Sequence, residues 1–201
     1  MPLAEAESKL TYADYLTWPD DERWELIEGV PYSMAPAPTR RHQEMVGEIY
    51  RQFANQLEDR RCRVYVAPFD VRLSAPDAAD SEIDTVLQPD VSVFCDPDRL
   101  DDRGAKGAPD LVVEVLSPAT AAKDLTVKRE VYSRHGVREY WVLEPGDRGW
   151  VIWERQGDAQ SSGGETFGAP EIRALEDVAV SEAVTDLHLD LDRLASILEV
   201  M

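Results

Sequence analysis

Apolar residues recur at two different spacings along this 201-residue chain, and the spacing separates expected helices from expected strands. From Thr39 to about Glu58 they fall three or four positions apart, which predicts an amphipathic helix. A second such helix is predicted at residues 121–132, and His135-Gly136 is a good C-terminal stop for it. Continuous or alternating apolar runs, which favour strands, lie at residues 63–73, 86–95, 110–116 and 138–143.

These elements follow one another as helix, strand, strand, strand, helix, strand, preceded by a short helix and by a hairpin at residues 23–34. The strand, helix and strand between residues 110 and 143 form a crossover unit, which implies parallel strands and a right-handed connection. We therefore expect an α/β fold of the mixed α+β kind, in which a mixed β-sheet is flanked by helices. A last strand is expected at residues 187–189 and a last helix at 191–198.

The length of the chain suits one domain over residues 1–201. Its core is expected at about 38–155, with an N-terminal helix and hairpin in 1–37 and a C-terminal extension in 156–201. No apolar run approaches the roughly 20 residues that span a bilayer, and the acidic N-terminus lacks the features of a signal peptide. We expect a cytoplasmic protein with no membrane segment, in which Cys62 and Cys95 are free buried thiols.

The formal net charge of −19 disfavours tight, non-specific binding to a polyanion. The charge is uneven, however, because arginines cluster early in the chain and further basic residues surround the second helix. The early arginines are Arg40, Arg41, Arg51, Arg60, Arg61 and Arg63. At about 0.15 M salt the Debye length is only about 8 Å, so the local sign of the charge matters more than the total.

Lys128 is the most informative residue, because the inward stripe of the second helix (Ala121, Leu125, Lys128, Tyr132) includes it. A buried lysine is rare unless it is paired. Its natural partners are Glu114, inside an apolar strand, and Asp90, at the start of another. Two carboxylates and a lysine that converge at one end of a sheet describe a site for a divalent metal and a phosphodiester. The alternative is an ion pair between Lys128 and Glu114 that only ties the helix to the sheet.

Asp90 follows Pro89 at the entry to its strand, and the alternative to a site residue is a strand-entry cap. A second Pro-Asp pair, Pro109-Asp110, competes for the same role. Asp110 lies four residues before Glu114 on one strand, about 13 Å away, which is too far for both to bind one magnesium ion at about 2.1 Å. Asp90 comes from a separate strand and can lie beside Glu114.

Three further residues are candidates for supporting roles. Asp124 lies four positions before Lys128 and can pair with it, as a site residue or as a surface salt bridge. Glu44 is a helix acid that could complete a metal shell, and His42 lies near the apolar stripe of the first long helix, where a packed histidine is the alternative. The chain contains no glycine-rich phosphate loop, no Gly-x-Ser-x-Gly elbow and no His-Glu-x-x-His zinc motif.

Taken together, these residues resemble the PD-(D/E)XK nuclease superfamily, and within it a restriction-endonuclease-like family abundant in cyanobacteria and formerly a domain of unknown function. The resemblance covers roughly residues 11 to 155. It is carried by Trp24-Glu25-Leu26-Ile27-Glu28-Gly29, His42, Gln88-Pro89-Asp90-Val91, Pro109-Asp110-Leu111-Val112-Val113-Glu114-Val115-Leu116-Ser117-Pro118, Asp124 with Lys128, and Glu139-Tyr140-Trp141-Val142-Leu143. One departure is that the superfamily's lysine usually stands two residues after the acid, where this chain has Leu116. The family resembled is similar to this chain in moving its lysine onto the following helix, which fits Lys128.

The resemblance implies a restriction-endonuclease-like core and a metal-dependent endodeoxyribonuclease that hydrolyses DNA phosphodiester bonds with Mg²⁺ or Mn²⁺. Asp90 and Glu114 would bind the metal, and Lys128 would orient the attacking water or neutralise the transition state. It also implies a homodimer, since nucleases of this type often cut two strands as pairs. Two alternatives stay open: a catalytically silent binding or oligomerisation module, favoured by the net charge, and a hydrolase of a small phosphodiester.

Overall fold

The computed structural model describes residues 9–19, 21–34, 37–118, 120–145, 149–156, 166–174 and 178–199. Within those residues the central element is a seven-stranded mixed sheet in the order β12-β11-β10-β9-β6-β3, with β13 paired to β11. Its strands are β3 (Arg63–Val66), β6 (Val91–Phe94), β9 (Leu111–Val115), β10 (Glu139–Glu144), β11 (Gly149–Gln156), β12 (Thr166–Phe167) and β13 (Glu171–Ala174). β9 and β10 are parallel, as the predicted crossover requires, and β6 and β3 continue the sheet antiparallel.

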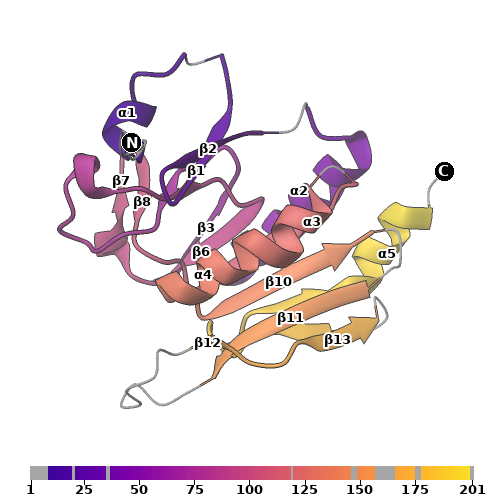
Figure 1. The fold of residues 1–201 in the computed structure, drawn as a ribbon. Helices are drawn as coiled ribbons and strands as arrows, with labels where there is room; N and C mark the ends of the chain where they lie inside the picture. Colours follow the sequence, from indigo (N-terminus) through magenta and orange to yellow (C-terminus); the bar gives the residue numbers. More distant parts are fainter. Residues whose placement is uncertain are drawn as a thin grey trace, which may run out of the picture.

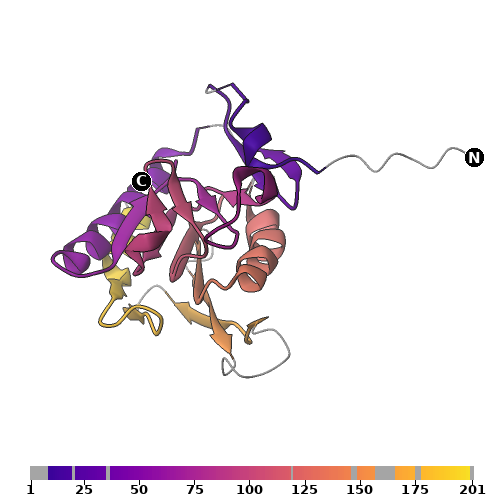
Figure 2. The same cartoon turned by 90° about the vertical axis from the view of Figure 1, so that its left-hand side faces the viewer.

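Helices cover both faces of this sheet (Figures 1 and 2). On one face lie α2 (Arg40–Leu57) and α5 (Leu191–Glu199), and on the other lies the segment formed by α3 (Ala121–Lys123), η3 (Asp124–Lys128) and α4 (Arg129–His135). Helix α2 buries the stripe Met45, Ile49, Phe53 and Leu57 against the sheet. This stripe has the spacing from which the helix was predicted, so burial of one apolar face explains why α2 forms here.

A second sheet stands beside the first and is built mainly from the N-terminal part of the chain. Among the described residues it has six strands in the order β2-β1-β5-β4-β8-β7. They are β1 (Trp24–Ile27), β2 (Val30–Ser33), β4 (Val71–Arg72), β5 (Val86–Leu87), β7 (Leu100–Asp101) and β8 (Gly104–Lys106). The remaining elements are α1 (Tyr12–Tyr15), η1 (Asp80–Glu82), η2 (Pro97–Arg99), and the pair β14 (Val178–Val180) and β15 (His188–Asp190). The second sheet matters for function because β1 carries an acid into the site described below.

The expected fold class is confirmed: the order α2, β3, β6, β9, a helical segment and β10 gives a mixed sheet flanked by helices. Two predicted strands were too long. Residues 63–73 form β3 and β4, and residues 86–95 form β5 and β6, so that each predicted strand contributes to both sheets. Pro68 and Pro89 lie in the interruptions, where a residue without an N–H ends the ladder.

The prediction of free thiols was wrong, since Cys62 and Cys95 form a disulfide. β3 pairs with β6 in a register that sets Arg63 opposite Phe94, and the next pair outward is Cys62 and Cys95. This proximity follows from strand pairing, which the spacing of two cysteines in the sequence does not encode. The cytoplasmic location stays a prediction. No helix within the described residues is both long and apolar enough to cross a membrane.

Two glycines differ in whether the structure leaves room for a side chain, and this difference tests the fold. Gly104 has a φ of +125°, and a Cβ there would lie 2.2 Å from the carbonyl oxygen of Asp70, whereas a Cβ at Gly47 in α2 would meet nothing within 4 Å. Gly104→Ala should therefore lower the free energy of unfolding by about 1–3 kcal/mol. Gly47→Ala should raise it by up to about 1 kcal/mol, because alanine is the better helix former. Urea unfolding monitored by circular dichroism measures both, and equal midpoints for the two variants would contradict the described backbone.

Candidate active site

Asp90 and Glu114 face each other across the pair β6–β9. The register that sets Val91 opposite Val113 makes Asp90 and Glu114 the next opposed pair, so their side chains lie on the same face of the sheet. The backbone N–H of Asp90 donates to Glu114 Oε2 at 3.2 Å. Asp90 Oδ2 accepts from the N–H of Val115 at 2.9 Å and lies 3.1 Å from His42 Nε2. The two acids predicted as metal ligands are therefore adjacent, and His42 joins them from α2.

Lys128 lies between the sheet and the helical segment, and only 4% of it is exposed. Its Nζ lies 2.9 Å from Glu114 Oε1, 3.0 Å from Glu25 Oε1 and 3.4 Å from Asp124 Oδ1. Tyr132 adds a hydroxyl that donates to Glu114 Oε1 at 3.2 Å. The inward position predicted from the apolar stripe is confirmed, although the ammonium group contacts Glu114 rather than Asp90.

A regular α-helix was predicted for the helical segment, but η3 within it is a π-helical turn. Wider turns of this kind often occur at functional sites. Here the turn buries both Asp124 and Lys128, and Lys123 at the preceding position reaches toward the same acids. Asp124 is thus a buried partner of Lys128, and the surface salt bridge considered as an alternative is wrong.

Glu25 belongs to the site, although no role was assigned to it from the sequence. It comes from β1 of the second sheet and is fully buried. Lys123 Nζ donates to Glu25 Oε2 at 2.6 Å, and the backbone N–H of Gln88 donates to Glu25 Oε1 at 3.2 Å. Like Glu114, Glu25 is an acid among apolar residues on a strand (Trp24-Glu25-Leu26-Ile27), and this pattern could have indicated its burial.

Four carboxylates and two ammonium groups meet here, so the acids exceed the nearby lysines. Burial, opposed by Lys128, raises the pKa of Glu114 well above its ordinary value, and it also raises the pKa of Asp124. Burial alone would raise the pKa of Glu25 as well, but Lys128 and Lys123 outweigh it and lower that pKa. Such a cluster favours an added cation, because a cation would relieve the repulsion that disfavours ionised Glu114 and Asp124.

A cavity of about 800 Å³ opens onto this cluster. Its lining includes His42, Asp90, Glu114, Lys123, Asp124 and Lys128. Asp124 Oδ1 is buried and accepts no hydrogen bond from a described residue. No arrangement of three or more His, Cys, Asp or Glu residues forms a ready-made metal cage in the described parts of the chain. Magnesium, however, is commonly held by one or two carboxylates and several waters, so the donors of Asp90 and Glu114 fit this ion.

Glu44 does not join the site, and the expectation that it completes a metal shell is corrected. Arg40 lies one turn earlier on α2, and its Nη1 donates to Glu44 Oε1 at 2.6 Å and to Oε2 at 2.7 Å. Glu44 is exposed and does not line the cavity. Asp110 is likewise occupied elsewhere, since it accepts from the N–H of Cys95 at 2.8 Å. This placement agrees with its exclusion on distance.

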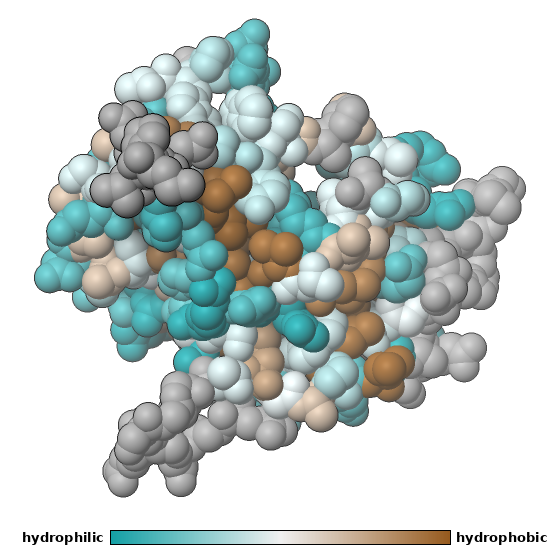
Figure 3. Space-filling view, viewed as in Figure 1, coloured by the Kyte–Doolittle hydropathy of each residue, from teal (hydrophilic) through white to brown (hydrophobic). Residues whose placement is uncertain are grey.

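Four of the six early arginines, which the sequence left as a possible basic face, are paired with acids. Arg40, Arg51, Arg60 and Arg61 pair with Glu44, Glu48, Asp186 and Asp96, respectively. Arg41 differs, because it lines the cavity and forms no ion pair with a described residue. Hydrophilic side chains predominate at the lower left of the face in Figure 3, whereas apolar side chains gather near its centre.

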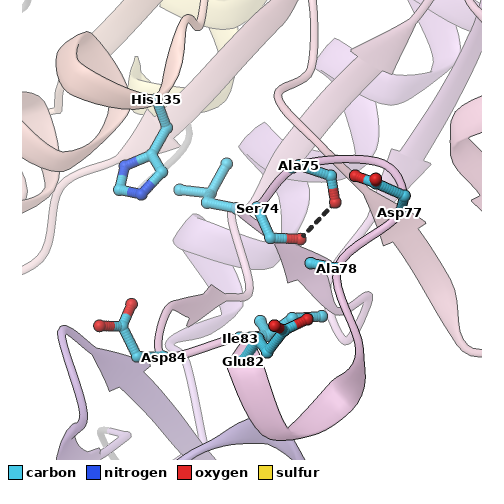
Figure 4. A pocket seen from close by; sticks show the side chains of 9 residues that line it. Ser74, Ala75, Asp77, Ala78, Glu82, Ile83, Asp84 and His135 are labelled. Carbon is cyan, nitrogen blue, oxygen red and sulfur yellow. Dashed lines mark hydrogen bonds between the residues drawn. The ribbon is translucent and has the colours of Figure 1, made fainter.

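A second hollow, of about 700 Å³, lies beside the loop at residues 74–84. Figure 4 shows its acids Asp77, Glu82 and Asp84 with His135 on the opposite side. It contains none of the predicted site residues and no lysine or arginine in its lining. The larger cavity is therefore the better candidate for an active site.

Comparisons with known proteins agree with this reading. A family model described as "Uma2: Putative restriction endonuclease" matches residues 12–189. An uncharacterized protein of Synechocystis sp. is 28% identical over 137 residues, which cover 67% of this chain and 68% of that protein. A crystal structure from Anabaena variabilis, described as a putative nuclease belonging to DUF820, has a TM-score of 0.71 at 21% identity, over 94% of this chain and 99% of that one. At that identity the structural likeness concerns the fold.

Lys128→Met tests whether one ammonium group holds the acids together. Removing one partner of a buried ion pair typically costs about 3–5 kcal/mol of stability. Adding Glu114→Gln should restore part of this loss, because it removes a buried acid that no longer has its cation. The variant's acids would have pKa values raised by burial without Lys128 to oppose it. Folding then favours the protonated forms of these acids more strongly than in wild type. The difference in free energy of unfolding between wild type and Lys128→Met should therefore grow as pH rises above about 4.5, the ordinary pKa of glutamate. Urea unfolding of both variants between about pH 4 and about pH 8 measures this, and a constant loss across that range would contradict the assignment.

Proposed function

This chain belongs to the Uma2 family of putative restriction endonucleases, and from that premise we propose that it is a magnesium-dependent endonuclease that hydrolyses phosphodiester bonds in DNA. The observation that carries the proposal is the opposition of Asp90 and Glu114 across two strands, beside a buried lysine and at the end of a cavity. A homodimer is part of the same proposal and stays a prediction.

Asp90 and Glu114 would hold the metal ion, with waters completing its shell. When bound, the ion supplies a water of lowered pKa and stabilises negative charge on the phosphate. His42 positions Asp90, since its Nε2 lies 3.1 Å from Asp90 Oδ2. Burial would lower the pKa of His42, but its contact with Asp90 outweighs burial and raises that pKa.

Lys128 and Lys123 differ in exposure and are assigned different roles. The side chain of Lys128 is 6% exposed and is surrounded by three carboxylates, so it acts on Glu114 by opposing the rise in pKa that burial causes. The side chain of Lys123 is 22% exposed and lines the cavity while Glu25 holds it. Lys123 is therefore the lysine that can contact a substrate phosphate, and Lys128 positions the acids. This differs from the role expected for Lys128 from the resemblance.

The proposed reaction is tested with supercoiled plasmid and Mg²⁺ or Mn²⁺. Wild-type protein should nick the plasmid, and Asp90→Asn should reduce the rate by at least about 10²-fold, the usual effect of losing one electrostatic contact in a transition state. Asp110→Asn is the matched control, because it changes the other Pro-Asp pair, outside the cavity, and should leave the rate within about threefold of wild type, a change below 1 kcal/mol.

Metal binding gives a readout that does not depend on cleavage. Magnesium at about 100 times its Kd should add about 2.7 kcal/mol to the free energy of unfolding, and Asp90→Asn should abolish this gain. Absence of both nicking and metal-induced stabilisation would contradict the proposal and favour a catalytically silent binding module, the alternative that the net charge of −19 supports.

The assignment of Lys123 makes a separate prediction about salt. Loss of one phosphate contact should reduce the slope of log affinity against log salt by about 0.7 to 0.9, so Lys123→Met should bind DNA more weakly with a shallower slope. Lys106→Met is the control, because Lys106 Nζ donates to the carbonyl of Ala78 and lies outside the cavity lining. Fluorescence anisotropy titrations measure the slope. An unchanged slope for Lys123→Met would contradict the assignment and mean that another cation contacts the phosphate.

A further inference from the structure

One face of α2 forms a wall of the cavity and extends beyond the catalytic acids. Thr39, His42, Gln43, Val46, Gly47 and Tyr50 all line the cavity. They are spaced one, three or four positions apart, as residues on one side of a helix must be. His42 contacts Asp90 at one end, and Tyr50 lies eight residues further on, about 12 Å along the helix axis.

Gly47 leaves a gap in the middle of this wall. It lies inside an 18-residue helix, where glycine is among the least favourable residues. No close approach of another segment requires it, since a Cβ there would meet nothing within 4 Å. Gly47 lies on the cavity lining, so a side chain at this position would occupy open space at the cavity wall.

The side chains of α2 next to the gap on the cavity lining are apolar Val46, aromatic Tyr50 and polar Gln43. Val46 and Tyr50 flank Gly47 on α2, and Met34 and Val66 line the same cavity. Tyr50 is 40% exposed, and no described residue hydrogen-bonds to its hydroxyl. The stretch of α2 from Val46 to Tyr50 contributes no acid to the lining, unlike the catalytic end. Arg41, on the same helix, supplies a cation without an acidic partner among the described residues.

An exposed aromatic ring beside an apolar side chain, with an arginine on the same helix, matches the chemistry of a nucleotide. Nucleobases stack on aromatic side chains, whereas phosphates pair with arginine. In a duplex both faces of each base are covered by its neighbours, so a base can stack on a side chain only when it is unpaired or turned out of the helix. The net charge of −19 acts against long-range attraction of a duplex and matters less for a few nucleotides held in a cavity.

We propose that Val46, Gly47 and Tyr50 form a subsite for an unpaired nucleobase near the scissile phosphate, so that the preferred substrate is single-stranded DNA or an unpaired segment. This inference rests on the proposed function and deepens it by naming the substrate class. Tyr50 supplies the stacking surface, the gap at Gly47 admits the base, and Arg41 contacts the backbone.

The test compares binding of a short fluorescent single-stranded oligonucleotide with binding of the same sequence in a blunt duplex, by anisotropy with Ca²⁺ in place of Mg²⁺ to keep the strand intact. Wild type should bind the single strand at least about tenfold more tightly. Tyr50→Ala should weaken single-strand binding about 5- to 100-fold, the range expected for one stacked base, and Tyr50→Phe should restore it.

Gly47→Met fills the gap with a good helix former. It should weaken single-strand binding at least about tenfold, yet unfold at a temperature no lower than wild type, because methionine favours the helix more than glycine does. Asn55→Met is the matched control, since Asn55 is exposed on the same helix outside the cavity lining and this change should not alter binding. A structural defect would instead lower the melting temperature together with the affinity.

The outcomes separate this subsite from the proposed nuclease activity. Unchanged single-strand binding by both Gly47→Met and Tyr50→Ala, or equal wild-type affinity for single strand and duplex, would overturn the subsite even where plasmid nicking persists. Absence of nicking, together with single-strand binding that both variants weaken, would overturn the nuclease and support the subsite. If Gly47→Met does not fold, the comparison of Tyr50→Ala with Tyr50→Phe decides.

Discussion

The ammonium group of Lys128 joins three carboxylates that come from three separate elements of the fold. Glu25 belongs to β1 of the second sheet, Glu114 to β9 of the central sheet, and Asp124 to the same π-helical turn as Lys128 itself. None of these acids could be buried and ionised without a cation, because desolvation of an unpaired carboxylate costs several kcal/mol. The same contact therefore joins the two sheets and the helical segment, whereas the register of β6 and β9 sets Glu114 opposite Asp90. Since Lys128 is surrounded by acids in this way, the proposed contact with a substrate phosphate is assigned to Lys123, which is more exposed.

Periodicity was sufficient to predict those parts of the site that depend on a single element. The inward position of Lys128 follows from the stripe of its own helix, and the rejection of Asp110 follows from distance along its own strand. The proximity of Asp90 and Glu114 needed one more step, the pairing of β6 with β9, which the order of elements made reasonable. The fold class could be predicted for the same reason, since the crossover between β9 and β10 restricts the topology.

Contacts between elements distant in sequence could not be predicted in this way. Glu25 joins Lys123 and Lys128 only because two sheets meet, and the disulfide of Cys62 and Cys95 forms only because β3 pairs with β6 in one register. Glu44 was misassigned for a local reason, because Arg40 one turn earlier holds its carboxylate away from the cavity. The π-helical turn was also missed, since a pattern of apolar residues does not distinguish it from an α-helix over five residues.

The net charge and the candidate site are compatible once the placement of charge is considered. Most of the early arginines are paired with acids on the surface, which leaves little free basic area to attract a polyanion. Arg41 and Lys123 line the same cavity as the acids that would bind a metal ion. Gly47 supports the same conclusion from stability: the helix retains a less favourable residue where it borders the cavity, and a departure from local preference of this kind is expected where function competes with folding. A protein that recognises a few nucleotides within a cavity does not need the extended basic surface on which duplex-binding proteins depend.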